Sequence, residues 1–292
     1  MRALAEFAMA GRRQAVQAAM LLGVLPLVNF LSAPVVALVF LRYGRNEGLI
    51  VLAWAVLPAL GWAVAGDMIP LLLLMGISVL AMVLRTSGSW EVTVLSGIGV
   101  GMGAQLGMLL QPELLQVLQQ QIELMLNTPE MQVQMAPLEP EQLQQMLRIF
   151  FGTMLMFLSL VLLMMARNWQ AKLYNPGGFR DEFHQLRLSW KSSAALLLMF
   201  VLAGLGVPLL QQLSLFFVMP LLFAGVALVH GMVGLKKWPG AVLVVFYASL
   251  LSPVVTQIVV FAAIADSWYD FRSRLRPKQG SQGGSDGSQD GL

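Results

Sequence analysis

Six stretches of the chain run for about 20 residues each without a single Asp, Glu, Lys or Arg. They lie at 49–66, 68–84, 92–111, 149–166, 194–210 and 214–235. A helix of that length crosses the hydrocarbon core of a bilayer, which is about 30 Å thick. Backbone groups in lipid must be hydrogen-bonded within their own segment, so we expect helices rather than isolated strands. The pattern predicts an all-α, polytopic transmembrane helical bundle.

The composition supports a membrane location. Hydrophobic residues make up 58% of the 292 positions and charged residues only 11%, whereas soluble domains carry about 25% charged residues. The net charge is +3, and no stretch gathers enough Lys and Arg to bind nucleic acid. The chain has no Cys and no catalytic or nucleotide-binding signature. We therefore expect no enzymatic activity, no cofactor and no metal.

Two further apolar runs, 14–41 and 239–266, are too long for one span and short for two full ones. Lys and Arg in short loops favour the cytoplasmic side of a membrane. If each long run enters the bilayer and returns, the basic residues at both of its ends fall on the same side. Both runs contain helix-breaking proline, at Pro26, Pro34 and Pro253. We therefore predict two Pro-broken hairpins, and about 8–10 membrane segments in all.

The charges of the remaining loops predict an orientation. Residues 112–147 contain five Glu and no Lys or Arg, whereas the loop 167–191 is basic. We predict a single transmembrane domain over 1–278, with both termini and loop 167–191 cytoplasmic and loop 112–147 external. The tail 279–292 is rich in Gly, Ser and Gln and is predicted to be disordered.

The external loop is rich in Gln, and its apolar residues recur at helical spacing. They are Leu114, Leu118, Ile122 and Met125. This spacing predicts an amphipathic helix that lies on the outer membrane surface.

A glycine-rich stretch lies inside the third apolar run. Its members are Gly97, Gly99, Gly101, Gly103 and Gly107. The pattern imitates a dinucleotide-binding fingerprint, but that fingerprint needs a preceding strand and a soluble helix N-terminus. Small residues at this spacing let membrane helices approach closely. We predict a helix-packing face, with no room for a larger side chain at Gly101 or Gly103.

The first membrane segment carries a second stripe of small residues, formed by Ala15, Ala19 and Gly23. Such a stripe is either an internal packing seam or a docking face for another membrane protein. Both contacts need the same spacing, so the sequence leaves the choice open.

Four polar residues lie within the apolar runs, namely Asn29, Gln105, Thr256 and Gln257. Polar groups at membrane depth are costly and often functional. Asn29 and the Thr256–Gln257 pair lie near the predicted bends, where broken helices expose backbone groups that bind polar solutes in transporters. These residues are candidate substrate-binding groups, or they only satisfy the freed backbone.

Two stretches on the predicted cytoplasmic side supply candidate contact residues. A tight turn at 175–178 precedes three apolar residues that we expect to face the lipid interface: Phe179, Phe183 and Leu186. The stretch 266–274 mixes aromatic residues with Arg, which is typical of a helix end anchored at a membrane boundary. The candidate contact residues are Asn175, Gly177, Gly178, Arg187, Asp266 and Arg272.

Several short motifs occur in these regions: Arg42-Tyr43-Gly44, Asn175-Pro-Gly-Gly-Phe179 with Phe183-His-Gln-Leu-Arg187, and Asp266, Trp268 and Asp270-Phe271-Arg272. Together they resemble the YybS family of bacterial multi-spanning membrane proteins, over most of residues 10–276. That family is distantly similar to the substrate-binding S components of energy-coupling-factor transporters, and remotely to the rod-shape protein MreD. S components dock their membrane partner through a small-residue stripe on the first helix. The resemblance implies a bacterial cytoplasmic (inner) membrane location.

Two functions from different classes remain open. The first is a solute-binding or transport component that resembles an S component and works with a separate energising protein. The second is a membrane scaffold for cell-envelope or division machinery, with loop 167–191 as its contact. Broken hairpins and small-residue seams favour transport, whereas the scarcity of buried polar groups favours a scaffold. We predict a transport component that sits in the lipid bilayer and binds a small solute.

The predicted orientation can be tested because the chain has no Cys. A single Cys reports its side of the membrane by reacting with a membrane-impermeant maleimide in intact cells. Arg45→Cys should stay unlabelled from outside, and Gln120→Cys should react and serve as the control. Labelling of residue 45 from outside would contradict the first hairpin.

Overall fold

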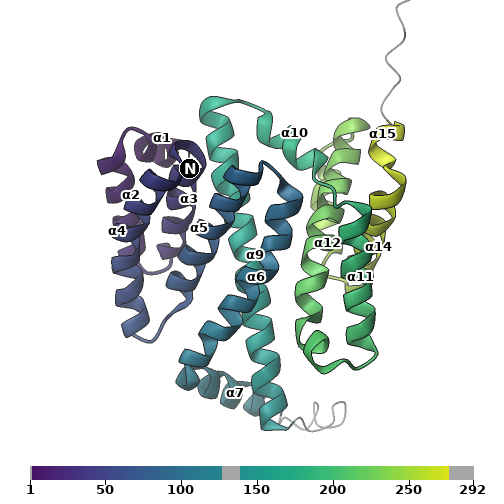
Figure 1. The fold of residues 1–292 in the computed structure, drawn as a ribbon, viewed down its shortest axis with the longest axis horizontal. Helices are drawn as coiled ribbons and strands as arrows, with labels where there is room; N and C mark the ends of the chain where they lie inside the picture. Colours follow the sequence, from purple (N-terminus) through teal and green to yellow (C-terminus); the bar gives the residue numbers. More distant parts are fainter. Residues whose placement is uncertain (1, 127–138, 276–292) are drawn as a thin grey trace, which may run out of the picture.

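The structure is a computed structural model that describes residues 2–126 and 139–275 (Figure 1). Within these ranges every regular element is a helix, so the predicted all-α helical bundle is confirmed. The predicted disordered tail 279–292 and the side chain of Met125 lie outside the described residues. The helices are α1 (Arg2–Met9), α2 (Arg12–Val24), η1 (Asn29–Leu31), α3 (Ser32–Tyr43), α4 (Arg45–Val64), α5 (Ile69–Ser87), α6 (Trp90–Gly107), η2 (Met108–Leu110), α7 (Pro112–Leu126), α9 (Pro140–Tyr174), α10 (Gly178–Gln185), α11 (Trp190–Gly204), α12 (Pro208–Leu235), α13 (Ala241–Ser249), α14 (Pro253–Tyr269) and α15 (Phe271–Leu275).

Five of the described helices are long and apolar enough to cross a bilayer: α4, α5, α6 with η2, α9 and α12. Two bent pairs, α10 with α11 and α13 with α14, raise this number to seven if each pair forms one span. Five of the six apolar runs of the sequence coincide with these five helices, whereas the run 194–210 covers most of α11, a short turn and the start of α12. The protein is a helical membrane protein.

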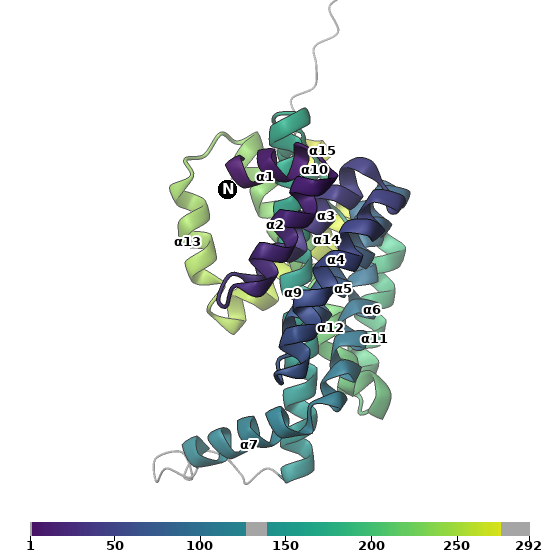
Figure 2. The same cartoon turned by 90° about the vertical axis from the view of Figure 1, so that its left-hand side faces the viewer.

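Both long apolar runs are broken in the structure. Residues 14–41 form two antiparallel arms, α2 and α3, joined by a turn that contains Pro26 and a left-handed Leu27 with φ of 66°. Pro253 begins α14, which is bent by 112° from α13. Helix α13 buries none of its residues, and Figure 2 shows it standing apart from the other helices.

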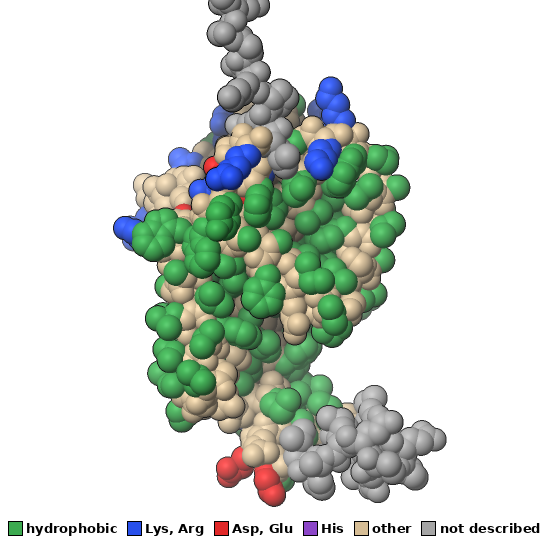
Figure 3. Space-filling view, turned by 90° about the vertical axis from the view of Figure 1, so that its right-hand side faces the viewer, with side chains coloured by type: hydrophobic (Ala, Val, Ile, Leu, Met, Phe, Trp, Pro, Cys, Tyr) green, Lys and Arg blue, Asp and Glu red, His purple; other side chains and the backbone are tan. Residues whose placement is uncertain are grey.

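The two ends of the bundle differ in charge. In Figure 3, Lys and Arg side chains gather at one end with a few Asp and Glu atoms among them, Asp and Glu without Lys or Arg lie at the other end, and hydrophobic side chains cover the surface between. Helices α1, α10 and α15 lie at the first end, which we call the basic end, and α7 lies at the acidic end. The first and last described helices therefore lie at the same end of the molecule.

Helix α9 has 35 residues and is roughly 50 Å long at 1.5 Å per residue, so it is much longer than a bilayer core. Residues 140–147 and 167–174 continue this helix, and the predicted loops on both sides are correspondingly shorter. Helix α7 confirms the amphipathic pattern. Its Leu115 packs against Leu143 and Leu147 of α9. The apolar side of α7 therefore contacts the protein itself, and not only lipid as we expected.

The glycines of α6 divide between two sides of the helix. Gly97 and Gly101 are buried against α9, and a Cβ atom on Gly101 would lie 2.7 Å from the Phe216 ring of α12. Gly107 faces Leu72 of α5 in the same way. The packing face predicted for Gly99 and Gly103 is wrong, because a Cβ atom on either would meet nothing within 4 Å. Gly99 and Gly103 each follow a buried glycine by two residues, which is about 200° of helix rotation. Both therefore point away from the seam.

The stripe on α2 is an internal seam. Ala15 is 2% exposed and Ala19 is 0% exposed, and a Cβ atom on Gly23 would lie 2.9 Å from Pro58 of α4. Helices α3 and α4 cover this side of α2. Of the two contacts that the sequence left open for this stripe, the structure shows the internal packing seam.

Replacement of Gly101 by Leu should destabilise the protein, because the side chain would overlap Phe216 and Met156. Overpacking of this kind costs about 1–3 kcal/mol or more, measured as the free energy of unfolding in mild detergent. Gly103→Leu is the matched control and should unfold like the parent. Equal stability of the two variants would contradict the packing seam.

Candidate functional site: the polar cap at the basic end

The polar residues of the basic end converge on one segment. Residues 175–189 comprise the turn after α9, helix α10 and the linker to α11, and we call them the cap segment. Figure 1 shows α10 bridging the space between α9 and α12 at the top of the bundle. Helix α10 contacts both of these helices.

The turn at the start of the cap segment forms as the sequence predicts. The amide of Gly178 donates to the carbonyl of Asn175 at 3.0 Å, and Gly177 has a φ of 91°, which favours glycine. A Cβ atom on Gly178 would collide with the Asn175 side chain. These three residues therefore reverse the chain between α9 and α10.

Helix α10 turns its apolar side inward. The rings of Phe179 and Phe183 stack with centroids 5.9 Å apart and pack against the hydrophobic core. Leu186 is only 3% exposed. The expectation that these three residues face the lipid interface is wrong, because α10 folds down over the ends of α9 and α12.

An ion pair fixes one side of α10. The Arg167 guanidinium of α9 donates to both carboxylate oxygens of Glu182, at 2.5 and 2.9 Å, and the Trp90 indole N–H donates to the same group at 3.2 Å. Burial alone would raise the pKa of Glu182, but the hydrogen bond and charge of Arg167 outweigh it and hold the pKa below its ordinary value. Glu182 is therefore ionised at neutral pH.

A buried ion pair fixes the other side. Asp266 of α14 and Arg272 of α15 approach to 2.7 Å, with side chains only 1% and 8% exposed. Arg272 also donates to the carbonyl oxygens of His184, at 2.6 Å, and Leu186, at 2.9 Å. The end of the chain is thus tied to the cap segment.

The linker that follows α10 is held in two further places. Arg187 pairs with Asp270 at 2.6 Å. The amide of Ser189, the N-cap of α11, donates to Glu91 of α6 at 2.8 Å. The structure therefore brings Arg187, Asp266 and Arg272 of the sequence candidates into one network. Arg167 and Glu182 also belong to it, although no pattern in the sequence indicates their pairing.

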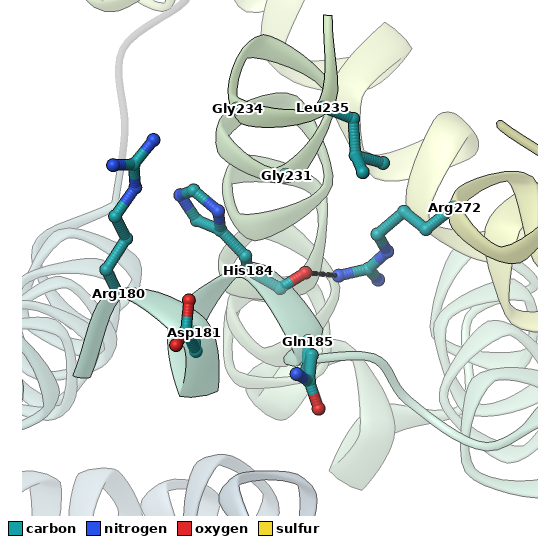
Figure 4. Close-up of a pocket in the computed structure, with 8 residues that line it drawn as sticks. All are labelled: Arg180, Asp181, His184, Gln185, Gly231, Gly234, Leu235 and Arg272. Atoms are coloured by element: carbon teal, nitrogen blue, oxygen red, sulfur yellow. Dashed lines mark hydrogen bonds between the residues drawn. The ribbon is translucent and has the colours of Figure 1, made fainter. Parts of the chain in front are cut away.

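Three open hollows border the cap segment, with volumes of about 410, 270 and 260 Å³. Figure 4 shows the second, in which Arg180 and the His184 imidazole project beside Gly234 of α12. Burial and then the nearby Arg180 lower the pKa of His184 below its ordinary value, so its imidazole is neutral at pH 7. Within residues 2–126 and 139–275, no group of three His, Asp or Glu side chains is arranged to hold a metal ion.

The candidate substrate-binding residues do not meet. Asn29 borders a cavity of about 10 Å³, room for about one water molecule. Thr256 donates to the carbonyl of Leu250 at 3.0 Å, which satisfies a backbone group freed at the bend. Gln257 is exposed, and Gln105 lies beside Gly152 of α9. Helices α2 and α3 lie on one side of α9 and helix α14 lies on the other (Figure 1).

Neither a protein-family model, nor a curated protein, nor a solved structure matches this chain. The resemblance to the YybS family therefore stays a prediction that rests on the short motifs.

Replacement of Arg272 by Met should destabilise the protein by about 3–5 kcal/mol, because it leaves the Asp266 carboxylate buried without its partner. The measurement is the free energy of unfolding in mild detergent. Arg2→Met is the control, since the Arg2–Glu6 pair is exposed and such pairs contribute about 0–1 kcal/mol. Similar effects of the two changes would mean that the buried pair does not fix the cap segment.

Proposed function

We propose that this protein is a membrane-embedded scaffold that binds an acidic surface of a partner protein through its basic end. The observation that carries this proposal is that the acids of the cap network are paired with Arg, whereas cations around the cap segment are exposed. Its acids Glu182, Asp266 and Asp270 are each paired with an Arg. The exposed charged side chains around it are mainly cations, with Asp181 as an exception: Arg180, Lys191, Lys236 and Lys237.

A scaffold needs a surface whose shape persists, and the cap segment meets this need. It is tied to α6, α9, α14 and α15 by charged hydrogen bonds. Charge complementarity speeds association and selects partners of opposite sign. By the positive-inside rule the basic end is cytoplasmic, so we place the partner in the cytoplasm or at the cytoplasmic face of the membrane.

The resemblance to bacterial membrane proteins supports an inner-membrane location with both termini cytoplasmic. The remote likeness to a rod-shape protein supports a partner in the cell-envelope or division machinery. Both statements rest on the motifs of the sequence.

A solute-binding transport component is the second candidate. The observation that favours it is the 112° bend between α13 and α14, because discontinuous helices form the binding sites of many transporters.

Site-specific photo-crosslinking in native membranes separates the two candidates. A photoreactive amino acid in place of Lys191 should give a discrete protein adduct, and the same residue in place of Glu113, at the acidic end, should give none. Lys236→Glu with Lys237→Glu should reduce the adduct several-fold by removing the cations. Adducts of equal yield from residues 113 and 191, or none from either, would contradict the scaffold.

The transport candidate has a different signature. A solute at 100 times its dissociation constant stabilises a protein by about 2.7 kcal/mol. Stabilisation of the purified protein by a metabolite fraction, without any protein adduct at residue 191, would favour transport.

A further inference from the structure

The largest of the three hollows beside the cap segment, about 410 Å³, lies where α3 and α5 end and α6 begins. Its lining includes two arginines, Arg85 and Arg167, the carboxylate of Glu182, and the apolar side chains of Leu84 and Trp90. Ligand pockets commonly have volumes of about 300–1,000 Å³ and combine apolar walls with a few fixed polar groups. This hollow has that composition.

Arg85 is held in place by neutral acceptors. Its Nη1 atom donates to the carbonyl oxygens of Leu41, at 2.5 Å, and Arg42, at 3.1 Å, which belong to the last turn of α3. Within residues 2–126 and 139–275, no carboxylate forms an ion pair with it. A guanidinium has five N–H donors, so the side chain is fixed while most of its donors stay available.

A glycine lies against the guanidinium of Arg85. A Cβ atom on Gly44 would lie 3.2 Å from Arg85 Nε, and Gly44 has a φ of 90°, which favours glycine. Any larger side chain at residue 44 would therefore crowd the guanidinium.

The other charges of this region are already engaged. Arg167 and Glu182 neutralise each other, Arg12 pairs with Glu47, and Arg42 lies over the Tyr174 ring at 3.9 Å. The hollow therefore carries one uncompensated positive charge, at Arg85. Leu84 and Trp90 supply an apolar wall beside it.

We propose that this hollow binds a small organic anion, with a phosphate or carboxylate group on Arg85 and an apolar part against Leu84 and Trp90. Arg binds both groups through parallel N–H···O bonds. The same chemistry is found in a free phosphorylated or carboxylated solute and in a phospholipid headgroup at the membrane boundary. This site is independent of the scaffold function.

Equilibrium dialysis of radiolabelled phenyl phosphate against the purified protein in a neutral detergent tests the site. The parent should bind one molecule saturably, and Arg85→Gln should weaken binding at least about tenfold, since it removes a charge-assisted contact. Arg45→Gln removes an exposed charge at the same end of the bundle and should bind like the parent. Absence of saturable binding to the parent, or equal binding by Arg85→Gln, would overturn the proposal.

Arg85 also caps α3, so Arg85→Gln is compared with Arg85→Lys. Lysine keeps the charge and a donor for the α3 carbonyl oxygens but lacks the planar fork, so this variant should fold and bind more weakly than the parent. Parent-like binding by Arg85→Lys and Arg85→Gln together would overturn the assignment to Arg85.

The source of the anion is assigned in nanodiscs. If phosphatidylglycerol nanodiscs suppress phenyl phosphate binding and nanodiscs of a neutral, phosphate-free galactolipid do not, a lipid headgroup occupies the hollow. If both nanodiscs allow binding, the natural ligand is a soluble anion. Loss of binding in both would mean that the detergent result reflects an opened structure, and the proposal would fail.

Discussion

The arrangement of the whole bundle depends on the close approach of α6, α9 and α12 near its middle. A Cβ atom on Gly152 of α9 would lie 2.7 Å from the Gly101 carbonyl oxygen, and the fully buried Phe216 ring of α12 closes the same junction. Lipid tails are as apolar as Leu, so burial of apolar surface does not drive membrane helices together, and close packing must do so. This junction joins the helices before α9 to those after it, and it sets the separation of α9 and α12 that α10 spans.

The cap segment is held by charged hydrogen bonds at the end of the bundle where the apolar surface stops. Charges there are partly removed from water, and an unpaired ion in such a place costs several kcal/mol. Glu182, Asp266 and Asp270 are each paired with an Arg, and Glu91 accepts the Ser189 amide. The network links α6, α9 and the consecutive helices α14 and α15, three regions that are distant in the sequence. Its geometry leaves cations on the outside, and this asymmetry connects the packing of the cap to the proposed binding of acidic partners and anions.

The sequence predicted the features that depend on local composition. The apolar runs predicted the helices, and proline at Pro26 and Pro253 predicted the two breaks. The pairing of Arg167 with Glu182 could not be predicted, because it depends on how α10 folds over α9. The Asp266–Arg272 pair requires Asp270 to adopt a left-handed φ of 45°, which ends α14 and returns the chain toward Asp266. The glycine pattern of α6 showed small residues but not which of them face a neighbouring helix.

The length of α9 and the position at which it crosses α6 have a mechanical consequence. Helix α9 is one continuous helix from the acidic end to the cap segment, and Gly152, where it touches α6, lies 12 residues from its first residue and 22 from its last. At 1.5 Å per residue these arms are about 18 and 33 Å long. A tilt of α9 about this crossing point therefore moves its cap end nearly twice as far as its other end, in the opposite direction. The helix has the proportions of a lever that relates the two faces of the membrane.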